Sequence, residues 1–319
     1  MVNAIMKSSR CRTSPEPTAT VVVPDFEVLL AQTRALTPAW QRRLSRAQVQ
    51  ALDPETHLSV LITGQAQPLA PLSYRADFGR DPASFCLRAD PVRLVPDLAA
   101  VWMHPGQMAL DSPLAAAVSQ VLAESGLRFE LASPERGYVL CDQPPQCQFT
   151  TPWAARGESL DAIMPEGPES GLWRRLLSDI QVLAHQHQSG EQAVGGLWFH
   201  SGGLPITSHP LPTVRTLSAV QADTALVARA LGVPEVTLKT NEVGVDAADS
   251  EGAQAEWLEW VPASGDSQEA MQALEALLTP LWRRLRWRGL RRLTLASPRR
   301  AWHWRTSDVW RLRGRRGVS

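Results

Sequence analysis

The sequence predicts an α/β or α+β fold built on a mixed sheet with flanking helices. Segments with helical apolar spacing alternate along the chain with short strand-like runs, a pattern typical of this class. The chain has 319 residues, of which 44% are hydrophobic, so it can bury a substantial core. No internal repeat is visible in the sequence.

Short strands and loops dominate the expected first third. The predicted elements are a strand at 21–23, a helical region at 24–52 that breaks near Thr37, a strand at 57–63, a loop at 68–82, and strands at 85–88, 92–95 and 98–103. The loop is inferred from its prolines and from Gly79, which interrupt any regular pattern.

The best-marked helix of the first half begins near Asp111 or Ser112. Either residue can cap it, Pro113 suits its first turn, and Gly126 can end it. The next two runs alternate like paired strands with a turn at 133–134; they are 127–131 and 137–141.

In the second half, three helices and three strands are expected. The helices run from 172 to 187, from 217 to 231 and from about 267, and the strands are 255–261, 290–295 and 302–312. Asp266 and Glu269 form a capping-box pattern for the last helix, which Pro280 should kink or end early. An acidic loop is expected at 241–254.

We expect residues 1–20 to be a disordered lead and residues 21–316 to form a single globular domain. Prolines between 144 and 168 place a subdomain border near 144–170. The start of the chain is polar, and no apolar run approaches the roughly 20 residues that a membrane-spanning helix needs. We therefore expect a cytoplasmic protein that does not enter a membrane.

Metal and disulfide signatures are not visible in the sequence. The cysteines form no C-x-x-C pair and have no histidine at zinc-finger spacing; they are Cys11, Cys86, Cys141 and Cys147. A cluster of aspartates fits no EF-hand loop and is interpreted as turn-forming and capping residues; these are Asp77, Asp81, Asp90 and Asp97. We expect free thiols, no bound metal and no cofactor.

The formal net charge is zero, but its distribution is uneven. The segment 283–316 contains many arginines but only one acid, Asp308, and tryptophans are interleaved with the arginines. This region could bind single-stranded nucleic acid, or it could form strands with tryptophan inside and arginine outside. We favour the second interpretation because no recognised nucleic-acid motif accompanies the pattern.

Polar groups and glycines are most concentrated between Leu172 and Pro205. An amphipathic helix there ends in His185 and His187, and Gln181 shares a face with His185. The run Leu197-Trp198-Phe199-His200 leads into Ser201, Gly202 and Gly203, whose backbone N–H groups could face a ligand. The run matches neither a nucleophile elbow nor a Walker loop, so a tight structural turn is the alternative interpretation.

Several segments, taken in order, resemble the RpfE-type regulatory proteins of bacteria. They are 74–78, 87–92, the hairpin 126–140, the Gln181 to His187 helix end and 197–205. The resemblance covers most of the chain beyond Val21. It implies a role in regulating extracellular enzyme and polysaccharide production.

The same segments are similar, more distantly, to the substrate-domain insertion of archaeal-type cofactor-independent phosphoglycerate mutases. The candidate counterparts are Arg75, Arg136, His185, Trp198 and Gly203. Two asparagines of that pattern are replaced here, one by Ser189 or Gly190 and one by Gly196. That superfamily holds two metal ions with Asp and His residues, whereas this chain has no adjacent Asp-His pair. The resemblance implies a retained fold region without the metals that catalysis requires.

We therefore predict a regulatory or ligand-sensing protein that is not an enzyme. The candidate site for a small anion consists of Arg75 and Arg136 as charge partners, Gln181 and His185 as hydrogen-bonding groups, and the backbone of Ser201, Gly202 and Gly203 as donors. A protein partner is also expected. The alternatives are a metal-dependent phosphomutase or phosphatase-like enzyme, and a nucleic-acid binder that uses the Trp/Arg-rich C-terminal region.

Overall fold

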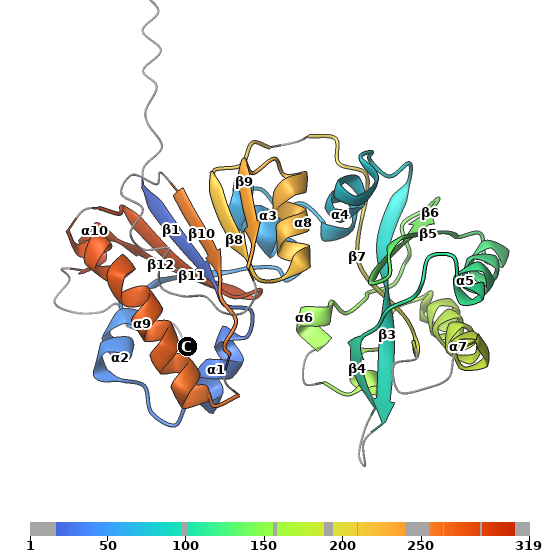
Figure 1. Ribbon diagram of the computed structural model, residues 1–319, viewed down its shortest axis with the longest axis horizontal. Coiled ribbons are helices and arrows are strands. Elements are labelled where there is room, and N and C mark those ends of the chain that lie inside the picture. The colour runs from blue at the N-terminus through green and yellow to red at the C-terminus, as the bar shows by residue number, and fades with distance from the viewer. Residues whose placement is uncertain are drawn as a thin grey trace, which may run out of the picture.

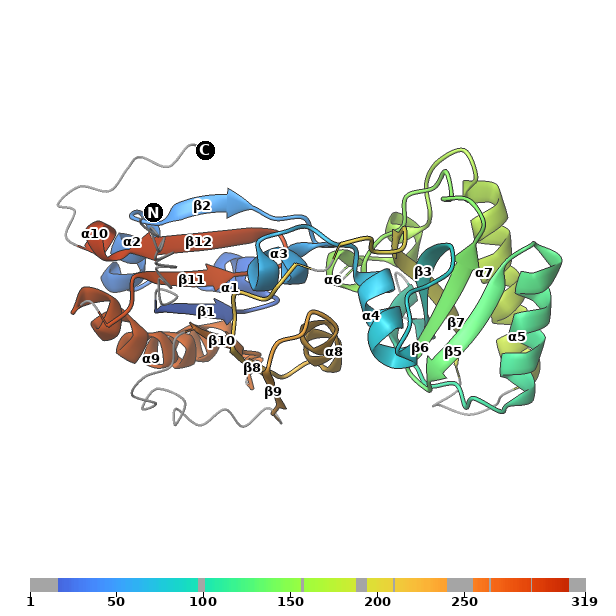
Figure 2. The same ribbon diagram turned by 90° about the horizontal axis from the view of Figure 1, so that it is seen from above.

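The protein was analysed as a computed structural model. It describes residues 17–96, 101–155, 158–187, 194–208, 210–239, 255–263, 265–287 and 289–309. Two lobes lie side by side, each built on its own sheet (Figures 1 and 2). The fold class predicted from the sequence is confirmed, because one of the sheets is mixed and helices flank both.

The first lobe contains a seven-stranded sheet with the order β2-β12-β11-β1-β10-β8-β9. The strands are β1 (Thr18–Val22), β2 (Gln48–Ala51), β8 (Thr216–Ala219), β9 (Glu235–Leu238), β10 (Ala255–Glu259), β11 (Arg292–Ala296) and β12 (Arg300–Arg305). The run from β11 to β9 is parallel, whereas β12 and β2 add antiparallel pairs at one edge.

Helices cover both faces of this sheet, although not along its full length. One face packs against α1 (Phe26–Gln32), α2 (Pro38–Leu44) and α9 (Ser267–Arg286), where Val21, Leu293 and Trp304 are buried. The other face packs against α3 (His57–Thr63) and α8 (Ala222–Ala230). The short α10 (Thr306–Val309) follows β12.

The second lobe contains an antiparallel sheet. Its strands are β3 (Phe85–Pro96), β4 (Val101–Pro105), β5 (Arg128–Ser133), β6 (Arg136–Cys141) and β7 (Gly196–Gly203). The long β3 pairs with β7 along one edge and with β6 and then β4 along the other. Two helices, α5 (Pro113–Glu124) and α7 (Ser170–His187), bury its outer face.

The lobes meet at α4 (Leu69–Phe78), which packs against α8 of the first lobe and β7 of the second. The short α6 (Pro152–Ala155) and a 3₁₀ helix (Leu160–Ile163) lie on the second lobe. The chain passes into the second lobe between α4 and β3 and returns between β7 and β8. The sequence-based border at 144–170 therefore falls within the second lobe.

Several predicted elements are confirmed by the structure. In α5 the Ser112 hydroxyl accepts from the Ala115 amide, and in α9 the Asp266 carboxylate accepts from the amides of residues 268 and 269. The predicted hairpin is β5–β6, and the predicted helix from 172 is α7. The strand predicted at 255–261 is β10.

Other predictions were wrong. Residues 57–63 form the helix α3, not a strand. The sequence misleads here because both sides of this short apolar run are buried, and such burial removes the periodicity that distinguishes a helix from a strand. Residues 69–78 form α4, not a loop. Pro68 precedes this helix and Pro71 lies in its first turn, where a missing N–H costs nothing, and Gly79 ends it at φ 67°.

Two helices differ from their predicted extent. The segment 217–231 divides into β8 and α8. Pro280 does not end α9, which continues to Arg286 because Leu274, Leu278 and Leu281 bury both of its halves in one core. The predicted lead at 1–20 overlaps β1, which begins at Thr18. The acidic segment 241–254 and residues 1–16 lie outside the described residues.

Within the described chain, no helix combines the length and the apolar character that crossing a bilayer requires.

Candidate ligand site between the lobes

A cavity of about 580 Å³ lies where the two lobes face each other. Most of its wall comes from the second lobe, and the first lobe contributes the start of α8. The lining residues are Arg88, Asp90, Pro91, Val92, Trp102, Met103, His104, Pro105, Glu135, Arg136, Pro152, Ala155, Glu158, Trp198, His200, Gln221, Ala222 and Asp223. Because α8 follows β8, this cavity lies at the carboxyl ends of the parallel strands, where open α/β sheets bind ligands.

Strand alternation places the polar groups of the second lobe on one face. Leu87 and Ala89 of β3 are buried beneath α5 and α7, so Arg88 and Asp90 lie on the opposite face. In β7 the same alternation separates Phe199 from the cavity-lining His200. The two neighbouring strands thus bring their polar residues together.

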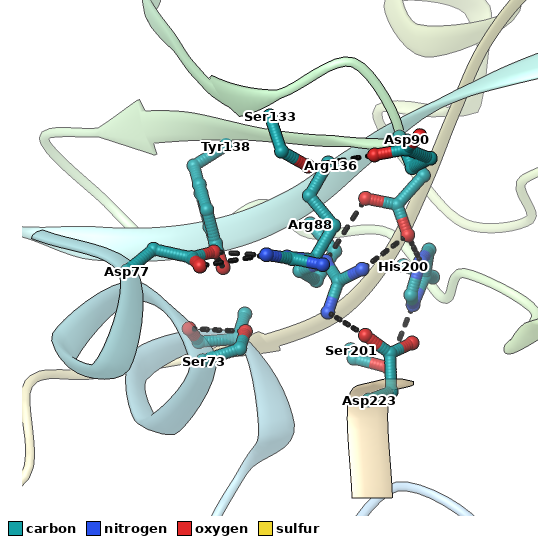
Figure 3. A network of polar contacts seen from close by, with 12 residues as sticks. Ser73, Asp77, Arg88, Asp90, Ser133, Arg136, Tyr138, His200, Ser201 and Asp223 are labelled. Atoms are coloured by element: carbon teal, nitrogen blue, oxygen red, sulfur yellow. Dashed lines mark hydrogen bonds and ion pairs between the residues drawn. The ribbon is translucent and has the colours of Figure 1, made fainter. Parts of the chain in front are cut away.

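Arg88 is the centre of the polar network drawn in Figure 3. Its side chain is 1% exposed, its Nε and Nη2 donate to the two Asp90 oxygens at 2.9 and 2.6 Å, and its Nη1 donates to Asp223 Oδ1 at 3.2 Å. The guanidinium also lies 5.7 Å from the centre of the Tyr138 ring. Burial alone would lower the pKa of Arg88, but Asp223 and Asp90 raise it well above its ordinary value. Arg88 therefore remains charged and links β3 to α8 of the other lobe.

His200 continues the network on the far side of Asp90. Its Nε2 lies 3.0 Å from Asp90 Oδ2, and its Nδ1 lies 2.8 Å from the Ser201 hydroxyl. Burial would raise the pKa of Asp90, but Arg88 and His200 outweigh it and lower that pKa to about 2. The carboxylate is thus held ionised between two partners.

The Ser201, His200 and Asp90 contacts resemble the order of groups in a hydrolase triad, but the placement differs. Ser201 is fully buried and does not line the cavity. Its backbone has φ 54°, in the left-handed region that a serine seldom occupies. A substrate in the cavity does not reach this hydroxyl, so we interpret Ser201 as a group that holds the His200 ring in place.

Arg136 forms a second, partly buried ion pair at the cavity wall. Its Nε and Nη2 donate to the Asp77 oxygens at 3.0 and 2.8 Å, and the Tyr138 hydroxyl donates to Asp77 Oδ2 at 2.6 Å. The hydrogen bond with Asp77 raises the pKa of Arg136, whereas burial raises the pKa of Tyr138 well above its ordinary value. Since Asp77 lies on α4, this pair fixes α4 to the second sheet.

The start of α8 is held by Glu259 at the end of β10. Its Oε2 accepts the Val220 and Gln221 amides, each at 2.8 Å, and its Oε1 accepts the Thr224 hydroxyl at 2.9 Å. Burial raises the pKa of Glu259. These bonds set the position of Asp223, and with it the partner of Arg88 in the first lobe.

The cavity combines apolar walls with an excess of acidic groups. Trp102, Met103 and Trp198 supply apolar surface. Among the described residues, the ionisable lining residues other than histidine are two arginines, Arg88 and Arg136, and four acids, Asp90, Glu135, Glu158 and Asp223. A small free anion therefore finds no net positive charge in this cavity.

The structure divides the residues that the sequence suggested as one site. Arg136 lines the cavity, whereas the other six predicted residues are not among its lining residues. Arg75 lies on α4 with Asp81 at 3.9 Å, and Gln181 and His185 are exposed on α7, which covers the outer face of the second sheet. Gly202 and Gly203 end β7, where a Cβ on Gly203 would lie 2.2 Å from the Pro68 side chain.

The candidate site predicted from the sequence leaves out Arg88, Asp90, His200 and Asp223, although His200 is named at the end of the strand before the glycines and Asp90 among the clustered aspartates. A signal for the first three was present, because Arg88-Ala89-Asp90 and Trp198-Phe199-His200 alternate with the period of a strand that has polar groups on one face. Asp223 carried no such signal, since it reaches Arg88 across 135 residues of sequence.

The structure also gives the surroundings of the cysteines, of the possible metal ligands and of the Trp/Arg-rich strand. Cys86, Cys141 and Cys147 are free thiols, and burial raises the pKa of each; Cys11 lies outside the described residues. Among the residues that the structure describes, no three His, Cys, Asp or Glu side chains gather in a group that could hold a metal ion. In β12 the Trp302 and Trp304 side chains are buried and Arg300 and Arg305 are exposed, as the strand interpretation predicted.

Comparisons with known proteins identify structural neighbours but no family. No protein-family model matches the sequence, and no curated protein matches it significantly. A cofactor-independent phosphoglycerate mutase from Thermoplasma acidophilum DSM 1728 is 12% identical and aligns over 91% of this chain and 90% of its own, with a TM-score of 0.42. The PH0037 protein from Pyrococcus horikoshii is also 12% identical and aligns over 95% and 91%, with a TM-score of 0.45.

Proposed function

We propose that the protein is a ligand-binding regulatory module that takes a small polar organic molecule, neutral or cationic, into the cavity between its lobes. The observation that carries this proposal is the composition of the cavity wall, in which tryptophan and methionine surfaces surround a fixed set of charged groups. Concave, largely apolar cavities with a few oriented polar groups are the usual sites for small molecules.

The excess of carboxylates determines the ligand's charge in this proposal. Asp90 is paired with Arg88 and hydrogen-bonded to His200, and the lone pairs that these contacts leave serve as acceptors for hydroxyl or amine donors. Asp223 is 28% exposed and is the more accessible acceptor. A small anion, the ligand expected from the sequence, would instead be repelled by the carboxylates of this wall.

A regulatory role follows if the ligand changes the contact between the lobes. The Arg88–Asp223 ion pair joins β3 to α8 within the cavity wall. A ligand that hydrogen-bonds to Asp223 competes with Arg88 and shifts the balance between arrangements of the lobes. The resemblance to RpfE-type regulatory proteins also favours a regulatory output, exerted through a protein partner in the cytoplasm.

The test uses the thermal unfolding of the full chain with a panel of neutral sugars, quaternary amines, free amino acids and phosphorylated sugars. We expect neutral or cationic members to raise Tm, since a ligand at about 100 times its Kd adds about 2.7 kcal/mol of stability. Ala222→Trp fills the cavity from an exposed position at the start of α8 and should abolish the rise.

The matched control is Ala31→Trp, which places the same side chain on an exposed position of α1 that does not line the cavity. Ligand-induced stabilisation should persist in this variant. Stabilisation that survives Ala222→Trp, or a panel in which only the phosphorylated sugars act, would refute the proposal.

A further inference from the structure

A second cavity, of about 930 Å³, lies over the seven-stranded sheet and outside the interlobe cavity. Its floor is the part of the sheet formed by β1, β11, β12 and β2, which Figure 2 shows side by side with α3 near one end. Its walls include residues of α3 and α10. The lining residues are Thr18, Thr20, Gln50, Leu52, Val60, Leu61, Gly64, Thr213, Val214, Arg291, Arg292, Thr294, His303, Arg305, Thr306 and Ser307. We call this cavity the sheet groove.

The floor of the sheet groove is polar, although the same sheet face is apolar farther along. On β11, Arg292 and Thr294 are followed two residues later by Ala296, which is buried in the core that α3 and α8 cover. On β1, Thr18 and Thr20 are followed in the same way by Val22. The polar residues begin where the helices stop covering the strands, so this part of the sheet is built to face water or a polar ligand.

The charge of the sheet groove is entirely positive in the part of the chain that the structure describes. Three arginines line it, Arg291, Arg292 and Arg305, and no Asp or Glu does. Arg292 and Arg305 are direct partners in the β11–β12 ladder, so their side chains project from the same face. Like charges placed opposite each other across a ladder are unfavourable. An anion between them would turn this repulsion into attraction.

Hydroxyl groups and an imidazole lie beside the two arginines. His303 Nδ1 is 3.0 Å from Thr294 Oγ1, and His303 Nε2 is 3.1 Å from Gln50 Oε1. The amide oxygen of Gln50 accepts, so Nε2 carries the proton and Nδ1 accepts from Thr294. Burial lowers the pKa of His303, and the neighbouring Arg292 and Arg305 lower it further. The imidazole therefore orients the Thr294 hydroxyl and the Gln50 amide in the groove without adding charge.

A second basic cavity, between α2 and α9, differs from the sheet groove because it includes an acid and one of its arginines is paired. Five arginines line it, Arg42, Arg43, Arg46, Arg283 and Arg286, together with the acid Asp308. Arg43 is paired there with Glu275 at 3.1 Å and stacks on Trp282. Part of the positive charge in that cavity is thus paired with acids of the same lobe, whereas no acid is among the described lining residues of the sheet groove.

We propose that the sheet groove binds a phosphate-type oxyanion carried by a small molecule. Arg292 and Arg305 would each offer a planar pair of N–H donors, and such pairs match the oxygen atoms of a phosphate group. The threonines of β1 would add neutral donors. The sheet groove lies at the amino ends of β1 and β11, whereas the interlobe cavity lies at the carboxyl ends of the parallel strands. The two sites are therefore independent.

A small phosphorylated molecule fits these observations better than single-stranded nucleic acid. Binding of single strands relies on aromatic side chains that stack on bases. Among the described residues, no aromatic side chain other than His303 lines the sheet groove, and Trp302 and Trp304 of the same strand are buried on the opposite face of the sheet.

Calorimetry on the full chain at low ionic strength, with inorganic phosphate and with pyrophosphate as probes, tests this proposal. Saturable binding is expected, tighter for pyrophosphate because it carries more charge. The double variant Arg292→Ser/Arg305→Ser should bind pyrophosphate at least about tenfold more weakly, since each charge-assisted hydrogen bond to phosphate contributes substantially to affinity. The single variants serve the same purpose if the double variant fails to fold.

The control is Arg42→Ser/Arg283→Ser, which removes the same amount of charge from the cavity between α2 and α9. Its affinity for pyrophosphate should remain within about twofold of the unaltered protein. Equal losses in the two double variants, or no saturable binding at all, would overturn the proposal. So would an oligothymidylate that binds more tightly than pyrophosphate and loses binding in Arg292→Ser/Arg305→Ser, since the groove would then serve nucleic acid.

Discussion

The interlobe cavity and the sheet groove both contain arginines, but only in the interlobe cavity are the arginines paired with carboxylates of the protein. Arg88 and Arg136 are held by carboxylates at hydrogen-bond distance and are largely buried. Arg292 and Arg305 face each other across a ladder in a groove with no acidic lining residue among those described. The first arrangement stabilises the fold and orients acceptors, whereas the second leaves positive charge available for a ligand.

The difference shows that the number of arginines alone does not identify an anion site. What matters is whether the protein supplies the counter-charge itself. An arginine already engaged by two aspartates offers little to an incoming anion, and its removal harms the protein. An arginine opposed by a second arginine offers much to an anion, and its removal costs little.

The largest expected effect comes from Arg88→Met, which leaves Asp90 and Asp223 without their shared cation. Loss of one partner from a buried ion pair typically costs about 3–5 kcal/mol. We expect the free energy of unfolding in urea to fall by an amount in this range. Arg292→Met is the matched substitution in the sheet groove and should change it by far less. Equal losses of stability in the two variants would contradict the view that Arg88 is held by carboxylates and Arg292 is not.

A smaller effect is expected from the titration of Asp90. Its pKa is lowered from the ordinary value of 3.8 to about 2, so its stabilising contribution is fully present above about pH 4 and is lost as the pH falls toward 2. The contribution corresponds to roughly 2 kcal/mol. Urea unfolding between pH 5 and pH 2.5 should show a steeper loss of stability for the unaltered protein than for Asp90→Asn. Parallel curves for the two proteins would argue against this ionised pair.

The smallest effect is expected from Arg292→Ser alone. Removal of one of two opposed arginines relieves a repulsion worth about 0.5 kcal/mol, so stability without added anion should stay the same or rise slightly. The measurement is urea unfolding at low ionic strength, repeated at high salt, where screening should remove the gain. A clear loss of stability would mean that Arg292 has a structural partner of its own.

Much of the secondary structure could be predicted because it depends on local signals. Ser112 and Asp266 accept backbone amides at the starts of α5 and α9, and such caps can be read from a few neighbouring residues. Residues 57–63 and 69–78 could not be predicted in this way. Burial on several sides hides the helical period of the first, and the prolines of the second favour a loop in sequence but are harmless at a helix start.

The candidate site was predicted less well than the fold. Arg136 was identified and does line the interlobe cavity, but Gln181 and His185 lie exposed on a helix that covers the other side of the sheet. The helical spacing of Gln181 and His185 placed them on a shared face and gave no information about which sheet face the helix would cover. Arg88 and Asp90 carried a strand signal that was visible but indistinguishable from ordinary surface alternation.

By itself the sequence determined the α/β class, the capped helices, the hairpin and the inward tryptophans of the last strand, because each depends on residues close together in the chain. Only the tertiary structure decided that Arg88 would meet Asp223 and that Arg292 would face Arg305 in a groove whose described lining residues include no acid. The physical reason is that ionic partners are chosen by how the sheets and helices pack, and residues 135 positions apart share no local pattern that could reveal the contact.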